Sequence, residues 1–246
     1  MAVAFSTYSR IPMPIFTWTE ENMRYSMCFF PIIGLVIGLL EILTDALCSF
    51  LHIGSLLRAV LLTVVPILVT GGIHMDGFLD TVDARRSYRG KEERLRILKD
   101  PNIGAFAAIY GMVLMLCEAG CFAEVAGRAL GGFCFGFVLS RCLSGLSVIY
   151  FPKARKNGSL RKMADASADR CGRIVLGECI VTAVCLALYS PVLAGFLLPG
   201  AGLVFFYYRK MSERQFGGTT GDLAGYFLTL CEFCMLAMSA AAGRFL

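Results

Sequence analysis

Seven apolar segments, each close to the length that crosses a bilayer, dominate this chain. A helix needs about 20 mostly apolar residues to span the hydrocarbon core. The segments are Met27–Phe50, Leu56–Gly71, Ile103–Val125, Ala129–Phe151, Ile174–Tyr189, Val192–Tyr208 and Leu223–Ala242. They lack strand-like alternation, and backbone groups in lipid must be satisfied internally. We therefore predict an all-α, polytopic integral membrane protein with about seven transmembrane helices, in a single domain over residues 1–246.

The composition agrees with a membrane protein. Of the 246 residues, 57% are hydrophobic and only 17% are charged, and the mean hydropathy is +0.69. These values lie outside the range of ordinary soluble domains. The net charge of +5 comes without a basic stripe interleaved with aromatic residues, which single-strand binders require. We expect the lipid bilayer as a partner and no nucleic acid.

The eleven cysteines lie mostly inside apolar segments. Cysteine in such surroundings behaves as a small hydrophobe. Cys231 and Cys234 have the CxxC spacing, but the sequence offers no second pair and no histidine ligands beside them. The sequence therefore indicates packing roles for the cysteines, and no metal or redox role for the Cys231–Cys234 pair.

The basic residues predict the orientation of the chain. With a cytoplasmic N-terminus and seven spans, 19 of the 23 Lys and Arg residues fall on the cytoplasmic side. This asymmetry is what the positive-inside rule describes. The same arithmetic places the acidic stretch after the second apolar segment on that side. We expect a protein of the cell (inner) membrane whose acidic and basic loops, and whose active site, face the cytoplasm.

The stretch Gly71–Arg85, GGIHMDGFLDTVDAR, carries the densest group of acids. Asp76, Asp80 and Asp83 are four and three residues apart, so on a helix they share one face and repel each other. A cation must compensate. Carboxylates suit Mg²⁺, which usually takes one or two of them and fills its other positions with water and substrate phosphates. The spacing predicts a Mg²⁺ and diphosphate site, with His74 as a general base or a phosphate contact.

An alternative interpretation of this stretch is a solvated loop whose acids pair with Arg85, Arg86 and Arg89. The regular helical spacing and the position at the membrane edge favour the metal site instead. The Gly71–Gly72 pair and Gly77 would let the backbone turn tightly and approach a ligand.

Two further motifs flank later apolar segments. Lys99, Asp100 and Asn102 form a candidate substrate-binding group, in which Asp100 or Asn102 is also suited to cap the helix that follows. The second motif is a glycine-rich turn that leads into a helix N-terminus, a geometry that binds phosphate through free N–H groups. Its candidate residues are Gly218, Thr220 and Asp222. Asp222 is alternatively the cap of the last span.

Arg141 lies inside an apolar segment, where a charged side chain is costly and should face the bundle interior. We predict that it contacts an anionic group of the substrate or a buried acid. Two GxxxG pairs, Gly34 with Gly38 and Gly132 with Gly136, predict close helix contacts.

These motifs together resemble the cobalamin synthase family. The family signature GGxHxDGxxDTxDA is found at Gly71–Ala84, KDPxxGA at Lys99–Ala105, and GGxTGD at Gly217–Asp222. The Ser140–Arg141 pair and the segment Ala154–Gly158 also lie where the family has an arginine in a span and a basic loop after it. The first motif is highly specific, and the resemblance covers nearly the whole chain.

The resemblance implies a Mg²⁺-dependent transfer of adenosylcobinamide phosphate from adenosylcobinamide-GDP. The acceptor is α-ribazole or its 5′-phosphate, and GMP is released as the lower nucleotide loop of vitamin B12 is completed. It also implies that Asp76, Asp80 and Asp83 hold Mg²⁺, while His74 or an aspartate accepts the hydroxyl proton. The candidate substrate-binding residues are Lys99, Asp100, Asn102, Arg141, Arg155, Gly218, Thr220 and Asp222.

Two other classes of protein fit parts of the pattern. CDP-alcohol phosphotransferases carry DxxDGxxAR, but here Ile73 stands three residues before Asp76, and Ala84–Arg85 comes too late after Gly77. An ion-coupled transporter would place its main carboxylates deep in the spans, whereas here they lie at the membrane edge. The sequence leaves a homo-oligomer and the specificity for the lower-ligand base open.

Overall fold

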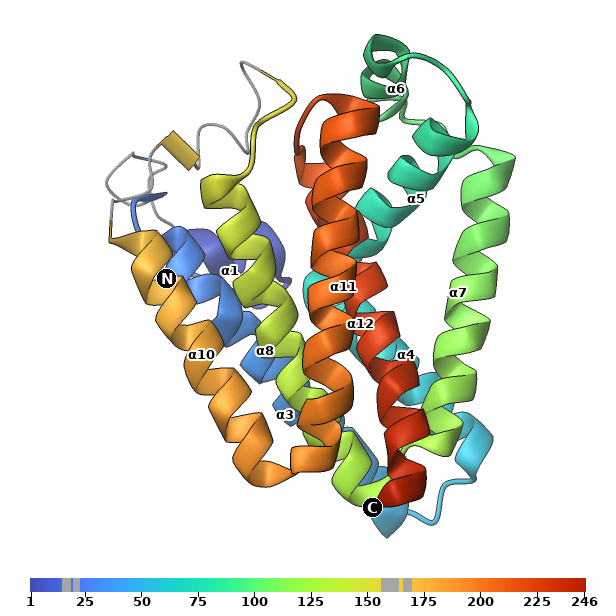
Figure 1. Cartoon of the computed structure of the whole chain (residues 1–246). Helices are drawn as coiled ribbons and strands as arrows, with labels where there is room; N and C mark the ends of the chain where they lie inside the picture. Colours follow the sequence, from blue (N-terminus) through green and yellow to red (C-terminus); the bar gives the residue numbers. More distant parts are fainter. Residues whose placement is uncertain (15–18, 20–22, 156–163, 166–169) are drawn as a thin grey trace.

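The computed structural model describes residues 1–14, 19, 23–155, 164–165 and 170–246. In this part of the chain the structure is built from helices (Figure 1). They are α1 (Ala2–Tyr8), η1 (Ser26–Phe29), α3 (Phe30–Phe50), α4 (Ser55–Thr70), α5 (Ile73–Arg86), α6 (Lys91–Ile97), α7 (Ala105–Glu124), α8 (Gly127–Tyr150), α10 (Cys171–Tyr189), α11 (Pro191–Phe216), α12 (Gly221–Ala242) and η2 (Gly243–Phe245). The described β-pairing is limited to an isolated bridge between Lys153 and Thr219.

The long helices confirm a polytopic membrane protein. Six of them, among the described residues, are long and apolar enough to cross a membrane: α3, α7, α8, α10, α11 and α12. The predicted second span differs from the others, because α4 is followed by α5 at an angle of 94° and only the pair together passes the same test. Alone, α5 is too polar to count as a spanning helix, and we treat it as lying outside the spans.

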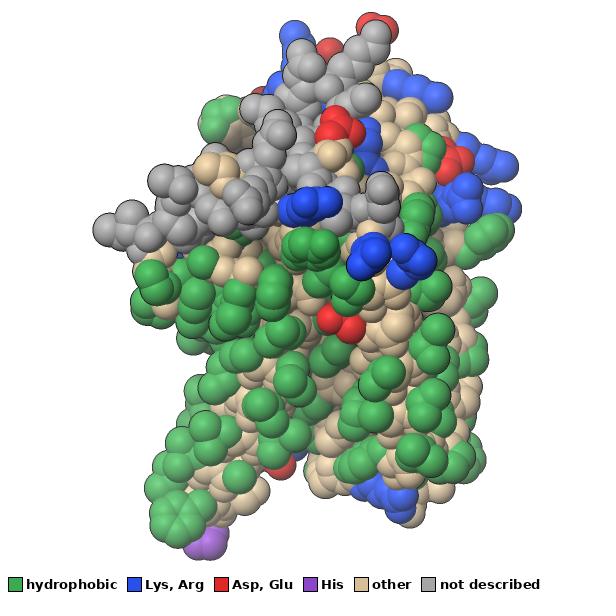
Figure 2. Space-filling model, turned by 90° about the vertical axis from the view of Figure 1, so that its left-hand side faces the viewer, with side chains coloured by type: hydrophobic (Ala, Val, Ile, Leu, Met, Phe, Trp, Pro, Cys, Tyr) green, Lys and Arg blue, Asp and Glu red, His purple; other side chains and the backbone are tan. Residues whose placement is uncertain are grey.

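The outer surface of the bundle is apolar. Large hydrophobic side chains are exposed on several helices, among them Leu43, Leu116, Leu188 and Leu203. In the face shown in Figure 2, apolar side chains cover the body of the bundle, and most of the visible Lys and Arg side chains gather toward one end. This distribution fits a bundle surrounded by lipid with a basic end in water. Inside it, α8 and α12 are the most enclosed of the six helices.

Glycines set the closest helix contacts. A Cβ added to Gly34 of α3 would lie 2.2 Å from the backbone oxygen of Phe137 in α8, and one on Gly38 would lie 3.1 Å from Cys134. This confirms that the first GxxxG pair permits close approach. Gly132 and Gly136 of α8 face other helices, through Leu193 of α11 and Met235 of α12, since α8 is surrounded on several sides.

A double-glycine turn separates α4 from α5. Gly71 ends α4 with φ of 67°, and Gly72 precedes α5 with φ of 80°. Both angles lie in the left-handed region that glycine adopts without steric cost. The N–H of Gly72 donates to the carbonyl of Ile67 at 2.9 Å, which closes the end of α4. The predicted tight turn is confirmed, and it redirects the chain so that α5 packs against α12.

The sequence predicts that Gly77 lets the backbone approach a ligand. In the structure Gly77 lies instead where α5 meets α12. A Cβ on Gly77 would lie 2.6 Å from the carbonyl oxygen of Asp222, and one on Gly225 would lie 3.1 Å from that of His74. Gly77 therefore allows α5 and α12 to touch and does not open the backbone to a ligand. The Phe78 and Tyr226 rings stack beside this contact at 5.5 Å.

All eleven cysteines are free. Cys231 is buried and Cys234 is half-buried, and the described residues contain no group of three His, Cys, Asp or Glu side chains arranged around a metal ion.

The substitution Gly34→Ala tests the contact between α3 and α8. The added methyl group meets backbone atoms of Phe137 that cannot move aside as a side chain would. We expect a loss of about 1–3 kcal/mol of unfolding free energy, typical of overpacking, seen as a lower thermal unfolding temperature in detergent. Gly202→Ala is the matched control, since nothing lies within 4 Å of that position. Equal stability of the two variants would contradict the contact.

Candidate active site

Three carboxylates gather where α5 meets the start of α12. Asp76 and Asp80 lie one turn apart on α5, and Asp222 lies in the first turn of α12. Burial, followed by the negative charges of Asp76, Asp222 and Asp83, raises the pKa of Asp80 to about 7. The tertiary structure thus adds Asp222 to the acids that the sequence placed on one helix face.

The neighbouring arginines do not compensate these charges. Arg85 donates to the hydroxyl of Tyr226 at 2.6 Å and to Gln215 at 3.3 Å. Arg86 lies over the ring of Tyr110 and donates to its hydroxyl. Arg89 is exposed, and no described ion pair involves the three acids of the motif. The alternative interpretation of a solvated loop with paired acids is therefore wrong, because the stretch is helical and its first two arginines bond elsewhere.

Asp83 holds the beginning of α7. Its two carboxylate oxygens accept the backbone N–H groups of Gly104 and Ala107, at 2.6 and 2.8 Å. The first N–H groups of a helix lack partners within the helix, and here a carboxylate from another helix supplies one. A Cβ on Gly104 would lie 2.6 Å from this carboxylate. Asp83 is thus already engaged in connecting α5 to α7.

Asp100 and Asn102 order the loop before α7. One oxygen of Asp100 accepts the backbone and side-chain N–H groups of Asn102, at 3.0 and 2.8 Å, and these bonds lower the pKa of Asp100. The prediction that one of them caps the helix is wrong, since Gly104 stands at the N-cap and Asp83 supplies the acceptor. Both residues instead line a cavity of about 240 Å³ together with Asp80. Lys99 is exposed and is not part of its lining.

His74 lies in the first turn of α5, two residues before Asp76. It is buried, and its Nε2 has no hydrogen-bond partner among the described residues. Its ring lies 6.3 Å from that of Tyr8 and 6.0 Å from that of Phe30. It lines a cavity of about 210 Å³ that Asp76 and Asp222 also line. The structure therefore brings His74 to the same cavity as two of the acids.

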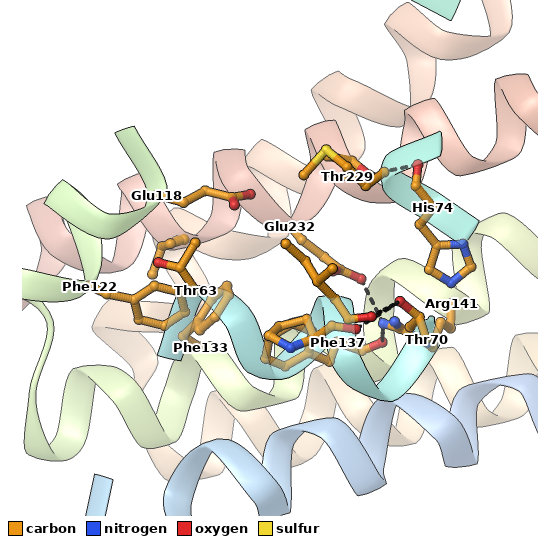
Figure 3. A pocket seen from close by; sticks show the side chains of 14 residues that line it. Thr63, Thr70, His74, Glu118, Phe122, Phe133, Phe137, Arg141, Thr229 and Glu232 are labelled. Atoms are coloured by element: carbon orange, nitrogen blue, oxygen red, sulfur yellow. Dashed lines mark hydrogen bonds and ion pairs between the residues drawn. The ribbon is translucent and has the colours of Figure 1, made fainter. Parts of the chain in front are cut away.

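Arg141 pairs with a buried acid, one of the two partners expected for it. Its Nη1 donates to Glu232 at 2.6 Å and to the carbonyl of Phe137 at 2.9 Å, and its side chain is fully buried. Figure 3 shows the pair in a cavity of about 50 Å³, which His74 and Glu118 also line. This cavity lies within the bundle, between α4, α7, α8 and α12. Arg141 does not line the cavities of Asp76 and Asp80, but His74 lines both this cavity and the one that Asp76 and Asp222 line.

The glycine-rich turn of the third motif has a structural role at two of its residues. Gly218 has φ of 148°, and a Cβ there would lie 2.6 Å from the carbonyl oxygen of Pro152. Thr220 caps α12 by accepting the N–H of Leu223 at 3.2 Å. Thr220, rather than Asp222, is therefore the cap of the last span. Asp222 is left to line the cavity that contains His74.

Arg155 approaches the site from the segment after α8. Its guanidinium donates to the carbonyl of Leu95 at 2.7 Å, and its charge acts on Asp222. The backbone beside it is joined to the third motif, because Thr219 N–H donates to Pro152 at 2.7 Å and Ala154 N–H donates to Thr219 at 3.0 Å. Residues 156–158 of the predicted basic loop lie outside the described residues.

The donor set agrees with a hard cation, although the described residues hold no ready-made group of three ligands. Asp76 and Asp80 offer carboxylate oxygens without an ion-pair partner among the described residues. Mg²⁺ is usually bound by one or two carboxylates together with substrate phosphates and water. Such a site is completed by substrate and water, so the two carboxylates of Asp76 and Asp80 agree with it.

The site residues predicted from the sequence do not include the N-terminal segment, which lies beside Asp76 in the structure. The segment Ser6–Ile11 forms a wall of a cavity of about 730 Å³, which Gly71, Gly72 and Asp76 also line. It begins in the last turn of α1, whose Val3, Ala4 and Phe5 are buried. A short stretch of seven helical residues far from the motifs carries no spacing signal, so only the tertiary structure places it beside Asp76.

A helical membrane bundle with a carboxylate cluster at its basic end is the class of protein that the fold and the site define. The sequence model of the family described as Cobalamin-5-phosphate synthase matches residues 1–240. The chain belongs to this family.

Relatives of the same family align over nearly their full length. The adenosylcobinamide-GDP ribazoletransferase of Lachnoclostridium phytofermentans is 44% identical over 243 residues, which covers 98% of this chain and 93% of the relative. The proteins of the same name from Desulfitobacterium hafniense (strain Y51) and Clostridium perfringens (strain SM101 / Type A) are 34% and 32% identical, over 95% and 94% of this chain and 93% of each relative. No solved structure gives a significant match.

The variant Asp83→Ala tests the structural role of the third acid. Loss of the acceptor leaves the N–H groups of Gly104 and Ala107 without their partner, and we expect a loss of about 1–2 kcal/mol in unfolding free energy. Thermal unfolding in detergent measures it. Asp80→Asn is the comparison, and we expect no loss of stability because the amide removes repulsion among the acids. A stable Asp83→Ala protein would contradict the capping role.

Proposed function

We propose that this protein transfers adenosylcobinamide phosphate from adenosylcobinamide-GDP to α-ribazole or α-ribazole 5′-phosphate. GMP leaves, and adenosylcobalamin or its 5′-phosphate forms. Membership of the Cobalamin-5-phosphate synthase family and the names of the relatives support the reaction. The observation in the structure that carries the proposal is the cluster of Asp76, Asp80 and Asp222, whose negative charge lacks a basic partner in the motif.

The reaction replaces the phosphoanhydride bond between the cobinamide phosphate and GMP with a phosphodiester bond to the acceptor. The acceptor hydroxyl forms a new P–O bond to the phosphorus that carries cobinamide, and the bridging P–O bond to GMP breaks. Phosphoryl transfer needs little covalent chemistry from the protein, since positioning and charge stabilisation supply most of the catalysis. The hydroxyl proton must go to a base. His74 is the candidate, because its Nε2 has no described partner and it lines the same cavity as Asp76.

The negative charge of the diphosphate requires a compensating cation beside the acids. When bound, Mg²⁺ would neutralise charge on the transferring phosphoryl group and on departing GMP. Asp76 and Asp80 would hold it, with Asp222 as the third carboxylate near them. We assign the third position to Asp222 in place of Asp83, since both carboxylate oxygens of Asp83 accept N–H groups of Gly104 and α7.

The remaining polar residues surround this centre. Asp100 and Asn102 line a cavity together with Asp80, and the charge of Arg155 acts on Asp222. We propose that these residues contact the anionic substrates. We also propose that the basic end of the bundle faces the cytoplasm, as the distribution of Lys and Arg favours, and that the protein lies in the cell membrane.

The variants Asp76→Asn and Asp80→Asn test the centre of the proposal. Each keeps the size of the side chain and removes the charge, and we expect GMP release to fall at least about 100-fold, as for loss of a strong transition-state contact. The assay follows GMP and cobalamin from adenosylcobinamide-GDP, α-ribazole and Mg²⁺ in purified membranes. Glu92→Gln on exposed α6 is the matched control. Near-normal turnover in either aspartate variant would overturn the assignment.

Removal of divalent metal is a second test. Treatment with a chelator should abolish GMP release, and Mg²⁺ should restore it. Asp222→Asn should raise the Mg²⁺ concentration for half-maximal rate by about 10- to 100-fold, as for other residues that support a metal. Asp83→Asn should leave that concentration unchanged. A shift in Asp83→Asn with none in Asp222→Asn would restore Asp83 as the ligand.

A further inference from the structure

An arginine lines the largest described cavity beside the acids. Its volume of about 730 Å³ lies in the range of sites that bury a small ligand. Asp76 and Arg10 both line it. The 210 Å³ cavity of His74 adjoins it, since Thr7, Ile73 and Asp76 line both. The two cavities therefore meet at Asp76, beneath the N-terminal segment.

The backbone of Arg10 is fixed beside the double-glycine turn. Its N–H donates to the carbonyl of Val69, near the end of α4, at 2.8 Å. The preceding helix is anchored too, because Phe5 is buried and the Tyr8 ring lies 4.5 Å from that of Phe30. The backbone of Arg10 is thus in place before any ligand arrives, which lowers the entropy cost of binding.

The side chain of Arg10 runs across Gly71. A Cβ on Gly71 would lie 2.5 Å from Nε and 2.7 Å from Cγ of Arg10. Gly71 thus serves two purposes, a left-handed turn and room for the arginine. Gly72, beside it, has open space where a Cβ would be. The guanidinium and a bare stretch of backbone therefore border the same cavity.

Among the residues that line this cavity, Arg10 carries the positive charge. No described hydrogen bond or ion pair uses its guanidinium, and its side chain is exposed. The hydroxyls of Thr7 and Ser9 donate to the carbonyls of Val3 and Phe5 at 2.7 Å, so they are already committed as donors. A guanidinium presents paired N–H groups that match phosphate oxygens.

We propose that Arg10 and the Gly71–Gly72 turn form a phosphate subsite that binds the diphosphate of the nucleotide substrate in the cavity that Asp76 also lines. This inference rests on the proposed function, since it names how that same site holds its anionic substrate. The subsite adds the positive charge of Arg10 to a cavity that the Asp76 carboxylate also lines. Arg10 is a binding residue in this arrangement, and the acids keep their own role.

Steady-state kinetics of three Arg10 variants in the full-length protein tests the subsite. Arg10→Ala and Arg10→Gln should raise KM for adenosylcobinamide-GDP about 10- to 100-fold, the range for a hydrogen bond to a charged group. The KM for α-ribazole should stay unchanged. Arg10→Lys keeps the charge and the aliphatic stem, so it should retain part of the affinity. If Arg10 had only a structural role, the Arg10→Gln and Arg10→Lys variants would have the same KM for adenosylcobinamide-GDP.

A binding measurement with GDP as the probe tests the subsite without requiring turnover. Calorimetry in detergent should show weaker GDP binding by Arg10→Gln than by the unaltered protein, and a smaller dependence on salt concentration, because one charge contact is lost. Arg24→Ala is the matched control, since Arg24 is also exposed near the N-terminus, lies over the Tyr25 ring and lines none of these cavities.

The outcomes separate the two proposals. An active unaltered protein whose Arg10 variants keep their KM and GDP affinity would overturn the subsite and leave the proposed function standing. An unaltered protein that releases no GMP from adenosylcobinamide-GDP, while GDP binding still depends on Arg10, would overturn the proposed function and leave a phosphate subsite. Thermal unfolding of each variant checks that the fold is intact.

Discussion

The site depends on the change of direction between α4 and α5. Two consecutive glycines in left-handed conformation turn the chain by 94°, and α5 then packs on α12 through Gly77 and Gly225. This turn carries Asp76 and Asp80 to the start of α12, where Asp222 lies. Residues with a side chain would meet a steric penalty at both glycines, and at Gly71 they would also collide with Arg10.

A second constraint is the concentration of like charge that the turn creates. The negative charges of Asp76 and Asp222 disfavour the ionisation of Asp80, while Arg85 and Arg86 bond to tyrosines. The fold holds this arrangement through contacts elsewhere, namely the stacking of Phe78 on Tyr226 and the bonds of Asp83 to α7. An unfavourable cluster supported by its surroundings is typical of a functional site.

The three acids of α5 illustrate how far spacing alone leads. Asp76, Asp80 and Asp83 follow one another at helical intervals, and their shared helix is present in the structure as α5. Spacing could not show that Asp83 is engaged by Gly104 and Ala107, because those partners come from a separate helix. In the same way, the cap of α7 and the acceptor of Arg141, Glu232, depend on which helices become neighbours.

The sequence by itself determined the helical membrane bundle, since long apolar segments have no other stable form in lipid. It also determined the motif with its acids and histidine, and the glycines that permit close helix contacts. Only the tertiary structure decided which acids face one another, that Asp222 joins Asp76 and Asp80, and that Arg10 borders the cavity of Asp76. The physical reason is that helix-forming patterns are local, whereas charge clusters and cavities arise between segments far apart in the chain.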